Sequence, residues 1–324
     1  RALREIYLTA FEIAVKKAKP WTVMNSYNKI NGFHGSENKH TQLDILRKEW
    51  GFDGYYVSDC GAICNFHTTH MITPDGPHSA ALALSHRCNV NCGGAYTNIL
   101  KALEDGLVTE ELIDENLVKA LTTRVLLGEF EEVRPYSDLG YDKLDCKEHK
   151  ALNKKAAEQC LVLLKNKDSF LPLNKEKVGR IAVVGPNSLS VTALEGNYNG
   201  YASEYITVAD GVRRVFTEAS INVERGSNYC FEALNHWSGF NNMLSDGIAA
   251  AQEADITILA LGLDCSVEGE DTGFDDDYTA CGDKRTLFLP ATQQKLADAV
   301  CDVCDNVIVV LMCGSSIDVG EKVR

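Results

Sequence analysis

The sequence predicts an α/β protein built from two successive units, each with a mainly parallel sheet. Three observations support this fold class: helical segments alternate with short apolar segments, the apolar segments of the second half are almost purely hydrophobic, and a stretch without periodicity separates the two halves. Strands that helices cover on both faces have continuous apolar runs, because neither face meets water. The 324 residues are 45% hydrophobic and 24% charged, a balance that excludes a disordered or fibrous chain.

The first half is expected to alternate helices with strands. Leu3, Ile6, Ala10 and Ile13 follow a helical spacing, and Pro20 ends that helix. The expected elements that follow are a strand over 21–27, a turn at Asn31-Gly32, a helix over 41–50, a strand over 54–59, a helix over 79–85, a short strand over 86–91, and helices over 96–128 divided at Asp105-Gly106.

The second half follows a linker over 131–150, which holds Pro135, Gly140 and many charges. Its expected elements are a helix over 149–165, a strand over 180–187, a helix over 247–254, a strand over 255–262, a helix over 291–304 and a strand over 306–312. This order predicts an α/β sandwich over 151–324, after a first domain over 1–130.

The charge balance argues against nucleic acid as a partner. With 32 Lys and Arg against 46 Asp and Glu, the net charge is −14, which repels phosphate backbones.

No apolar stretch reaches the roughly 18 to 20 residues of a membrane span, so no membrane span is predicted. The chain begins without Met or a signal-peptide apolar region, and we expect it to be part of a longer one. A signal peptide on the parent would predict a secreted or periplasmic protein, and its absence a cytoplasmic one; the sequence indicates no oligomeric state.

The cysteines and histidines predict neither a disulfide scaffold nor a metal site. Twelve Cys are too few for a small disulfide-rich fold, and buried thiols that act as small hydrophobic side chains are the expectation. Cys301-x-x-Cys304 has no second pair at zinc-ribbon spacing. His67 and His70 fit a polar loop better than a metal site, and neither GxGxxG nor GxxxxGK[ST] is present. No metal and no organic cofactor is therefore expected.

Asp59 is the first candidate for chemistry, because it stands at the carboxyl end of an apolar strand, where α/β barrels and sheets build their sites. An Asp that caps the next turn is an equally good interpretation. A second acidic segment, 267–271, follows the apolar strand at 255–262, and a solvated loop is its simpler interpretation. Two carboxylates from separate domains that face one cleft would suit glycoside cleavage, which needs a nucleophile and a proton donor.

The order and spacing of several segments resemble glycoside hydrolase family 3. In the first half, the segments that carry the resemblance are Val23-Met24-Asn25-Ser26-Tyr27-Asn28, Asn31-Gly32, Leu43 to Leu46, Trp50-Gly51-Phe52-Asp53-Gly54, Val57-Ser58-Asp59, Asn91-Cys92-Gly93, Leu107-Val108-Thr109, Arg124 and Leu127-Gly128. In the second half they are Leu163-Leu164-Lys165-Asn166, Leu171-Pro172-Leu173 and Val183-Val184-Gly185-Pro186. The resemblance covers nearly the whole chain.

The resemblance implies the C-terminal portion of a (β/α)8-type barrel, with about three of its eight strands, followed by the α/β sandwich. It implies a retaining exo-glycosidase in which Asp59 attacks the anomeric carbon, and Met24 and Tyr27 line the sugar subsite. The acid/base would come from the second domain, where the resemblance favours Glu270 and leaves Glu268 as the alternative. In a retaining enzyme the two carboxyl groups lie about 5 to 5.5 Å apart.

Two departures from the family pattern matter. Many β-glucosidases of the family have Trp after the nucleophile, whereas Cys60 follows Asp59 here and is the third residue expected at the sugar. Ser58-Asp59-Cys60 is similar to the β-xylosidase branch, so β-D-xylosides, including xylo-oligosaccharides, are the first substrate class, with α-L-arabinosides or β-glucosides as alternatives. The family's Lys-His pair, which holds sugar hydroxyls, has no match in this chain. The alternative function, from another class, is a non-catalytic carbohydrate-binding or scaffold fragment of the same fold.

Overall fold

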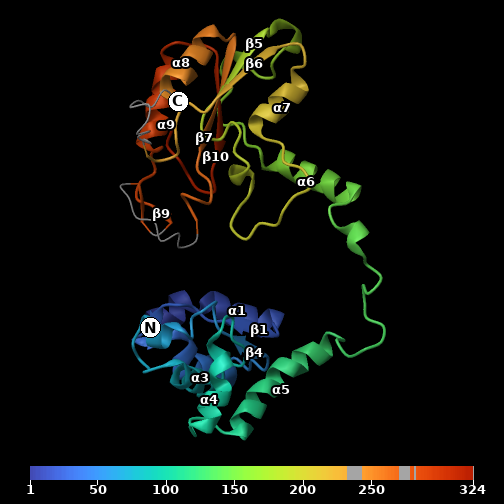
Figure 1. Cartoon of the computed structure of the whole chain (residues 1–324), viewed down its shortest axis with the longest axis vertical. Helices are drawn as coiled ribbons and strands as arrows, with labels where there is room; N and C mark the ends of the chain where they lie inside the picture. Colours follow the sequence, from blue (N-terminus) through green and yellow to red (C-terminus); the bar gives the residue numbers. More distant parts are fainter. Residues whose placement is uncertain (232–242, 270–277, 281, 324) are drawn as a thin grey trace. The chain divides into compact units, whose positions relative to one another are not determined.

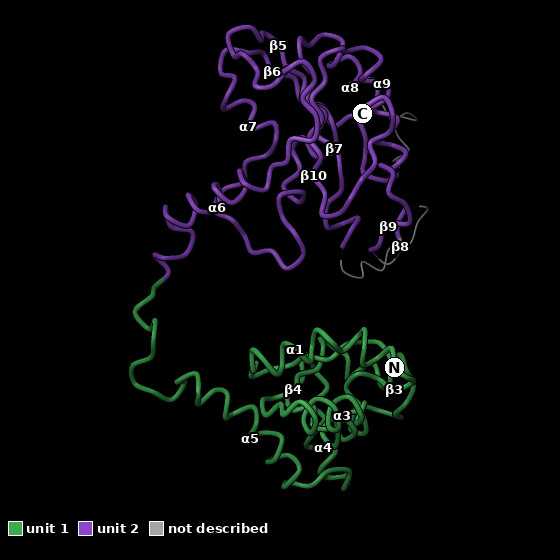
Figure 2. The backbone as a smooth tube through the Cα atoms, turned by 180° about the vertical axis from the view of Figure 1, so that it is seen from behind, with its two compact units in different colours: residues 1–140 green, residues 141–324 purple. Residues whose placement is uncertain are grey.

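A computed structural model describes residues 1–231, 243–269, 278–280 and 282–323. The chain forms two compact units, Arg1–Gly140 and Tyr141–Arg324, which Figure 2 distinguishes by colour. Each unit has its own hydrophobic core and is described by itself. The parallel sheet of the second unit confirms the predicted α/β fold class.

Unit 1 contains two parallel strands, β1 (Thr22–Met24) and β4 (Tyr55–Val57), in the register Met24↔Val57. Its α-helices are α1 (Thr9–Ala18), α2 (Asn65–Thr68), α3 (Gly76–Ser85), α4 (Ile99–Glu104) and α5 (Glu110–Leu126). The remaining described elements are the π-helices Leu3–Tyr7 and His40–Glu49, the 3-10 helices Gly35–Glu37 and Ala95–Asn98, and the hairpin strands β2 (Lys29–Ile30) and β3 (Phe33–His34).

The core of unit 1 is formed by large side chains from the helices and the loop after β4. Phe66, Ile63 and Ile45 are fully or almost fully buried there, and Trp50 and Tyr56 pack in the same cluster. Burial of each such side chain contributes roughly 1.5 to 3 kcal/mol relative to its exposure. This packing fixes the end of β4, where the chain turns back into α2.

The strand expected over 86–91 is reduced to one bridge, between Val57 and Val90. The side chain of Asn89 explains the difference, because its Oδ1 accepts a 2.8 Å hydrogen bond from the backbone N–H of Tyr56. A side chain thus occupies a position that a backbone carbonyl would fill in a regular ladder. Arg87 adds to this irregularity with a left-handed φ of 65°.

Unit 2 is built on a parallel four-stranded sheet with the strand order β10-β7-β5-β6 (Figure 1). The strands are β5 (Arg180–Val184), β6 (Ser220–Glu224), β7 (Ile256–Gly262) and β10 (Val307–Met312). The α-helices are α6 (Lys147–Cys160), α7 (Val208–Val215), α8 (Met243–Glu253) and α9 (Ala291–Cys301). Short elements complete the described part: Tyr141–Lys143, Lys167–Ser169, Lys175–Lys177, Thr192–Leu194, β8 (Thr279–Ala280) and β9 (Asp283–Lys284).

Helices cover both faces of this sheet, which explains why its two inner strands, β5 and β7, are largely apolar. Ala182 and Val184 of β5 pack with α8 and α9 on one face, and Ile181 and Val183 pack with α7 on the other. All seven residues of β7 are buried. The sheet therefore forms the middle layer of a three-layer sandwich.

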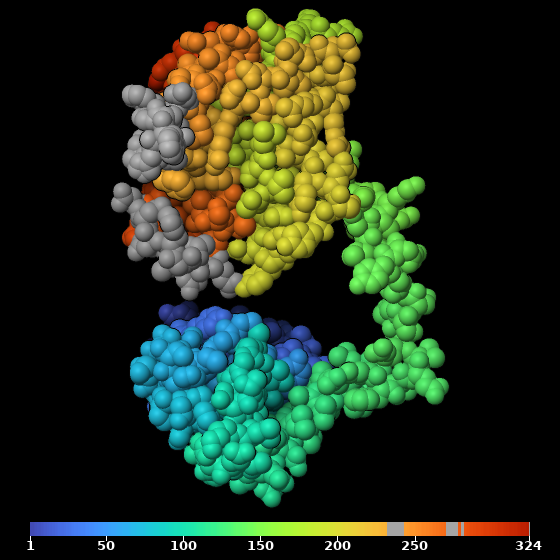
Figure 3. Space-filling view, in the orientation of Figure 1, coloured from blue at the N-terminus to red at the C-terminus, as the bar shows by residue number. Residues whose placement is uncertain are grey.

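Helix α6 protrudes from the rest of unit 2 (Figure 3). No residue of α6 is buried, and the helix ends at Cys160, earlier than the expected end at 165. Leu161 takes an extended conformation, and the apolar side chains of 161–164 are between 66% and 79% exposed.

Candidate active site

Three neighbouring chain segments of unit 1 end at the same edge of the parallel strands. Asn25 follows β1, Ser58 follows β4, and Asn91 follows the bridge residue Val90. Ser58 is buried, and its Oγ accepts hydrogen bonds from the Cys92 N–H (3.0 Å) and from Asn91 Nδ2 (3.1 Å). This edge is where barrels of parallel strands place their functional groups.

Asp59 lies at this edge with a partly exposed side chain. Its N–H donates a 2.6 Å hydrogen bond to Asn25 Oδ1, and its own Oδ1 accepts a 2.7 Å hydrogen bond from the N–H of Cys60. Among the described residues, none donates a hydrogen bond to Oδ2. The carboxylate is thus oriented through one oxygen while the other is available to a ligand.

Cys60 is exposed and forms a disulfide with Cys92, with 4.5 Å between the Cα atoms. This pair differs from the expected buried thiols, because two segments 32 positions apart in the sequence end side by side. Gly61, with φ 76°, turns the chain immediately afterwards, and its N–H donates to the carbonyl of Cys92. The bond therefore anchors the loop that begins at Asp59.

Met24 and Tyr27 belong to the end of β1 and the residues after it, beside the end of β4, but differ in their contacts. Tyr27 is 42% exposed, and its hydroxyl donates a 2.6 Å hydrogen bond to the carbonyl of Cys60. Met24 is 56% exposed, so it does not belong to the core of unit 1. Unit 1 thus brings Asp59, Cys60 and Tyr27 together.

The acidic candidates of unit 2 follow β7. The N–H groups of Val267 and Glu268 both donate to the carbonyl of Asp264, and Asp264 Oδ1 accepts from the N–H of Ser266. This turn holds Glu268, which is half-buried and whose Oε2 has no hydrogen-bond partner among the described residues. Glu270 lies outside the described residues.

Two side chains near Glu268 have shifted pKa values. Burial raises the pKa of Tyr278 far above its usual range, and the charge of Glu268 acts in the same direction. Burial also raises the pKa of Cys313, while Lys284 opposes the shift. The Tyr278 hydroxyl, which donates to the carbonyl of Phe288 (2.9 Å), is therefore a neutral donor at physiological pH.

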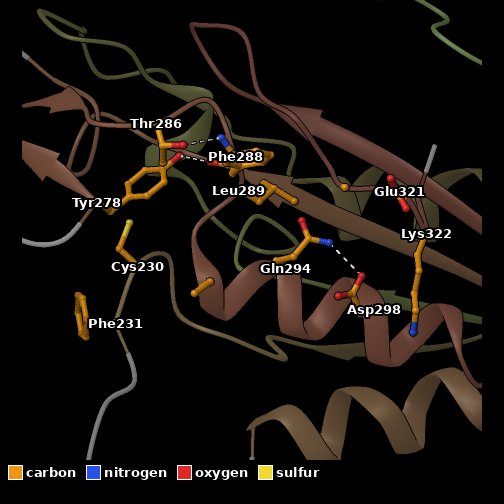
Figure 4. A pocket seen from close by; sticks show the side chains of 12 residues that line it. Cys230, Phe231, Tyr278, Thr286, Phe288, Leu289, Gln294, Asp298, Glu321 and Lys322 are labelled. Atoms are coloured by element: carbon orange, nitrogen blue, oxygen red, sulfur yellow. Dashed lines mark hydrogen bonds between the residues drawn. The ribbon is translucent and has the colours of Figure 1, made fainter.

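A cavity of about 860 Å³ also lies in unit 2, beside helix α9 (Figure 4). Tyr278, Phe288 and Leu289 form an apolar part of its wall, and Gln294, hydrogen-bonded to Asp298, forms a polar part. Of the predicted site residues that the structure describes, none lines this cavity. Tyr278, whose pKa Glu268 helps to raise, is nevertheless part of the lining.

The histidine pair that sequence analysis considered serves structural contacts. His67 Nδ1 lies 2.9 Å from Ser79 Oγ, and the ring of His70 packs edge-on against His34 at 4.7 Å. Within the described ranges, no group of three or more His, Cys, Asp or Glu side chains is arranged to hold a metal ion. The described helices include none long and apolar enough to cross a bilayer.

Sequence reasoning did not assign a role to Asn25, Ser58 or Asn91, although all three stand in the segments that carry the family resemblance. The available signal was their position, since each polar residue directly follows an apolar segment that leads to the same sheet edge. Their mutual hydrogen bonds depend on the parallel register, which only the structure gives.

Two family models match the chain in succession. The Glycosyl hydrolase family 3 N terminal domain matches residues 1–123, and the Glycosyl hydrolase family 3 C-terminal domain matches residues 161–323. Among curated proteins, the chain is 34% identical to an exo-α-(1→6)-L-arabinopyranosidase of Bifidobacterium longum and 32% identical to β-D-xylosidase 1 of Arabidopsis thaliana. Each alignment covers 98% of this chain and 39% of the relative, so the chain spans about two fifths of their length.

Solved structures give the same result. A family 3 exo-β-xylosidase, XlnD, in complex with a xylobiose aziridine probe matches with a TM-score of 0.81 and 28% identity, over 98% of this chain and 39% of that one. A β-glucosidase from Listeria innocua matches with a TM-score of 0.76 and 29% identity, over 99% of this chain and 42% of that one. The resemblance inferred from the sequence is confirmed, and the chain belongs to glycosyl hydrolase family 3.

Proposed function

We propose that this chain is part of a retaining exo-glycosidase that hydrolyses terminal β-linked sugars, with β-D-xylosides as the first substrate class. The observation that carries the proposal is the state of Asp59: one carboxylate oxygen is held by the N–H of Cys60, and Oδ2 has no hydrogen-bond donor among the described residues. Family membership and the glycosidases among the relatives support it.

In the proposed double displacement, Asp59 Oδ2 attacks the anomeric carbon of the terminal sugar. The bond from that carbon to the glycosidic oxygen breaks, and a protonated carboxyl of unit 2 gives its proton to the departing oxygen. The same residue, now a carboxylate, takes a proton from water, which attacks the anomeric carbon and releases Asp59. This sequence retains the anomeric configuration and requires two carboxyl groups about 5 to 5.5 Å apart.

Glu270 and Glu268 are the two candidates for the acid/base. The Glu-x-Glu pattern of the family favours Glu270. The buried Oε2, which has no hydrogen-bond partner among the described residues, favours Glu268, because an orphaned buried oxygen is rare in a native fold and calls for a ligand or a proton. Glu268→Gln and Glu270→Gln distinguish them: loss of the acid should slow hydrolysis of substrates with poor leaving groups much more than that of aryl glycosides with good ones.

The preference for xylosides rests on the residue after the nucleophile. Cys60, tied to Cys92, occupies the place where many β-glucosidases of the family carry Trp, and it offers no aromatic face to a sugar ring. Met24 and Tyr27 are proposed to line the same subsite. We also propose that residues 1–130 form the barrel part and residues 151–324 the sandwich. α-L-Arabinosides and β-glucosides are the competing substrates, since relatives include an arabinopyranosidase and β-glucosidases.

The direct test uses the complete polypeptide that the gene encodes and an aryl β-xyloside. We expect release of the phenol, which a non-catalytic carbohydrate-binding protein would not produce. Asp59→Asn should reduce kcat by several orders of magnitude, because the amide cannot form the glycosyl-enzyme. Asp53→Asn is the matched control, since Asp53 is an exposed carboxylate of the same unit that pairs with Lys119. Equal activity of Asp59→Asn and Asp53→Asn would contradict the proposal.

A further inference from the structure

The buried side-chain amide of Asn25 contacts the backbone of Asp59, the proposed nucleophile. Asn25 is 8% exposed, and its Oδ1 accepts the 2.6 Å hydrogen bond from the N–H of Asp59. The N–H of Asn25 in turn donates to the carbonyl of Val57 (3.1 Å), which continues the parallel pairing of β1 with β4 by one residue. Asn25 is therefore fixed by its own backbone and reaches Asp59 with its side chain.

The other end of the Asn25 amide is held as well. Its Nδ2 donates to Ser36 Oγ. The N–H of Asp59 settles the orientation of the amide, because it can only donate and must therefore face Oδ1. Ser36 is fully buried, and its N–H donates to His34 Nδ1 at 3.2 Å. Buried polar groups joined in this way act as a rigid unit, since each would be costly to leave unpaired.

The loop that carries Ser36 is itself locked against the strand end. Gln42 Nε2 donates a 2.6 Å hydrogen bond to the carbonyl of Gly35. At Gly35 a Cβ atom would lie 2.5 Å from the carbonyl oxygen of Ser26, so only glycine allows this close approach. The contact holds Ser36 within hydrogen-bond distance of the Asn25 side chain.

We infer that Asn25, supported by Ser36, is a positioning residue for Asp59. The inference rests on the proposed function. The hydrogen bond from Asp59 N–H fixes the peptide plane before Asp59 and with it the direction of the Cα–Cβ bond, while the Cys60 N–H fixes Oδ1. Together the two bonds determine where Oδ2 points. A nucleophile must approach the reacting carbon within a narrow geometry, and a displacement of about 1 Å can cost roughly a hundredfold in rate.

The test compares two buried amides in the complete polypeptide. Asn25→Ala removes the acceptor for Asp59 N–H, whereas Asn116→Ala removes an equally buried amide that bonds Asn89 and the carbonyl of Leu84 and has no contact with Asp59. We expect Asn25→Ala to lower kcat for an aryl β-xyloside about 10- to 100-fold with little change in KM, and Asn116→Ala to lower the melting temperature without a comparable loss of kcat.

Asn25→Asp provides the rescue variant, because its carboxylate keeps an oxygen in the place of Oδ1. It should recover most of the rate at its own pH optimum, below the pH at which the acid/base loses its proton, and the acidic limb of its pH–rate profile should move to higher pH, since a second negative charge opposes ionisation of the nucleophile. Recovery of the rate is the readout for positioning, because the shift of the limb reports only that the new charge lies close to Asp59.

Hydrogen exchange of the Asp59 amide gives a readout that does not depend on catalysis. Asn25→Ala should accelerate this exchange, and Asn116→Ala should not. Faster exchange in a polypeptide without hydrolytic activity would overturn the proposed function alone. Unchanged exchange of the Asp59 amide in Asn25→Ala, or an equal loss of kcat in Asn25→Ala and Asn116→Ala, would overturn the positioning role.

Discussion

Cys60, the residue after Asp59, is joined by a disulfide to Cys92, 32 positions later in the sequence. Both cysteines stand at the edge where β4 and the bridge at Val90 end. The loop that carries the proposed nucleophile therefore has a covalent anchor in addition to the hydrogen bonds of Tyr27 and Asn25.

Reduction of this disulfide should destabilise unit 1. Closing a loop of this length lowers the conformational entropy of the unfolded chain, which stabilises the folded state by about 3 to 4 kcal/mol. We expect a reductant to lower the melting temperature of the unaltered chain and to have no such effect on Cys60→Ser/Cys92→Ser, which should already be destabilised. Cys64→Ser, at a half-buried free thiol, should respond to reductant like the unaltered chain. A melting temperature insensitive to reductant would contradict the stabilising role of the Cys60–Cys92 disulfide.

Phe66 should contribute more to the stability of unit 1 than most of its side chains. It is fully buried in the core and packs edge-on against His34 at 4.6 Å. Phe66→Ala should lower the free energy of unfolding by about 3 to 5 kcal/mol, because it removes buried surface and leaves a cavity. Phe33→Ala is the control, since Phe33 is 59% exposed and its loss should cost far less. Denaturant titration monitored by circular dichroism measures both, and similar losses would contradict the assigned core.

The stability of unit 1 should fall between pH 6.5 and pH 4. Burial lowers the pKa of His34 to about 4 from its ordinary 6.5, and the charges of His70 and Lys29 act in the same direction. Between these two pH values His34 is protonated in the unfolded chain but neutral in the folded chain. Stability present above pH 6.5 is therefore lost as the pH falls toward 4. Protonation would also remove the Nδ1 acceptor for the N–H of Ser36.

Denaturation at a series of pH values checks this prediction. His40→Gln is the control, because His40 lies on the surface, and its pH dependence should match that of the unaltered chain. His34→Gln should show a weaker dependence between pH 6.5 and 4, at the cost of lower stability at pH 7. An unchanged dependence in His34→Gln would show that another group is responsible.

Gly185 should tolerate no side chain. It follows β5 with φ 132°, and a Cβ there would lie 2.1 Å from the carbonyl oxygen of Ala260 in β7. Gly185→Ala should therefore force β5 and β7 apart and destabilise unit 2 severely. Gly211→Ala is the matched control: Gly211 lies within α7, a Cβ there meets nothing within 4 Å, and the change should stabilise by roughly 0.5 to 1 kcal/mol. Thermal unfolding compares the two.

Much of the fold follows from periodicity. The strand segments around Val57 and Ile258 are apolar runs between helical patterns, and both form parallel strands. The sequence reading missed α7 and β6. Helix α7 is only eight residues long, and β6 has polar residues at Ser220, Asn222 and Glu224, so neither has the strong pattern that the other elements show.

The candidate site was predictable only in part. Asp59 could be singled out because its position at a strand end is a local property of the sequence. The contacts of Asn25 with Ser36, and of Cys60 with Cys92, are set by parallel register and by the packing of a loop against a strand end. Such relationships join residues distant in the chain, and no spacing rule encodes them.

Covalent trapping shows whether Asp59 is the nucleophile of a retaining β-glycosidase, as we propose. The complete polypeptide is incubated with a 2-deoxy-2-fluoro-β-xyloside that has a good leaving group, which slows breakdown of the glycosyl-enzyme, and is then digested for mass spectrometry. We expect one added fluoroxylosyl group on the peptide that contains Asp59, and none in Asp59→Asn. A label on another carboxylate, or hydrolysis that persists in Asp59→Asn without a label, would contradict it.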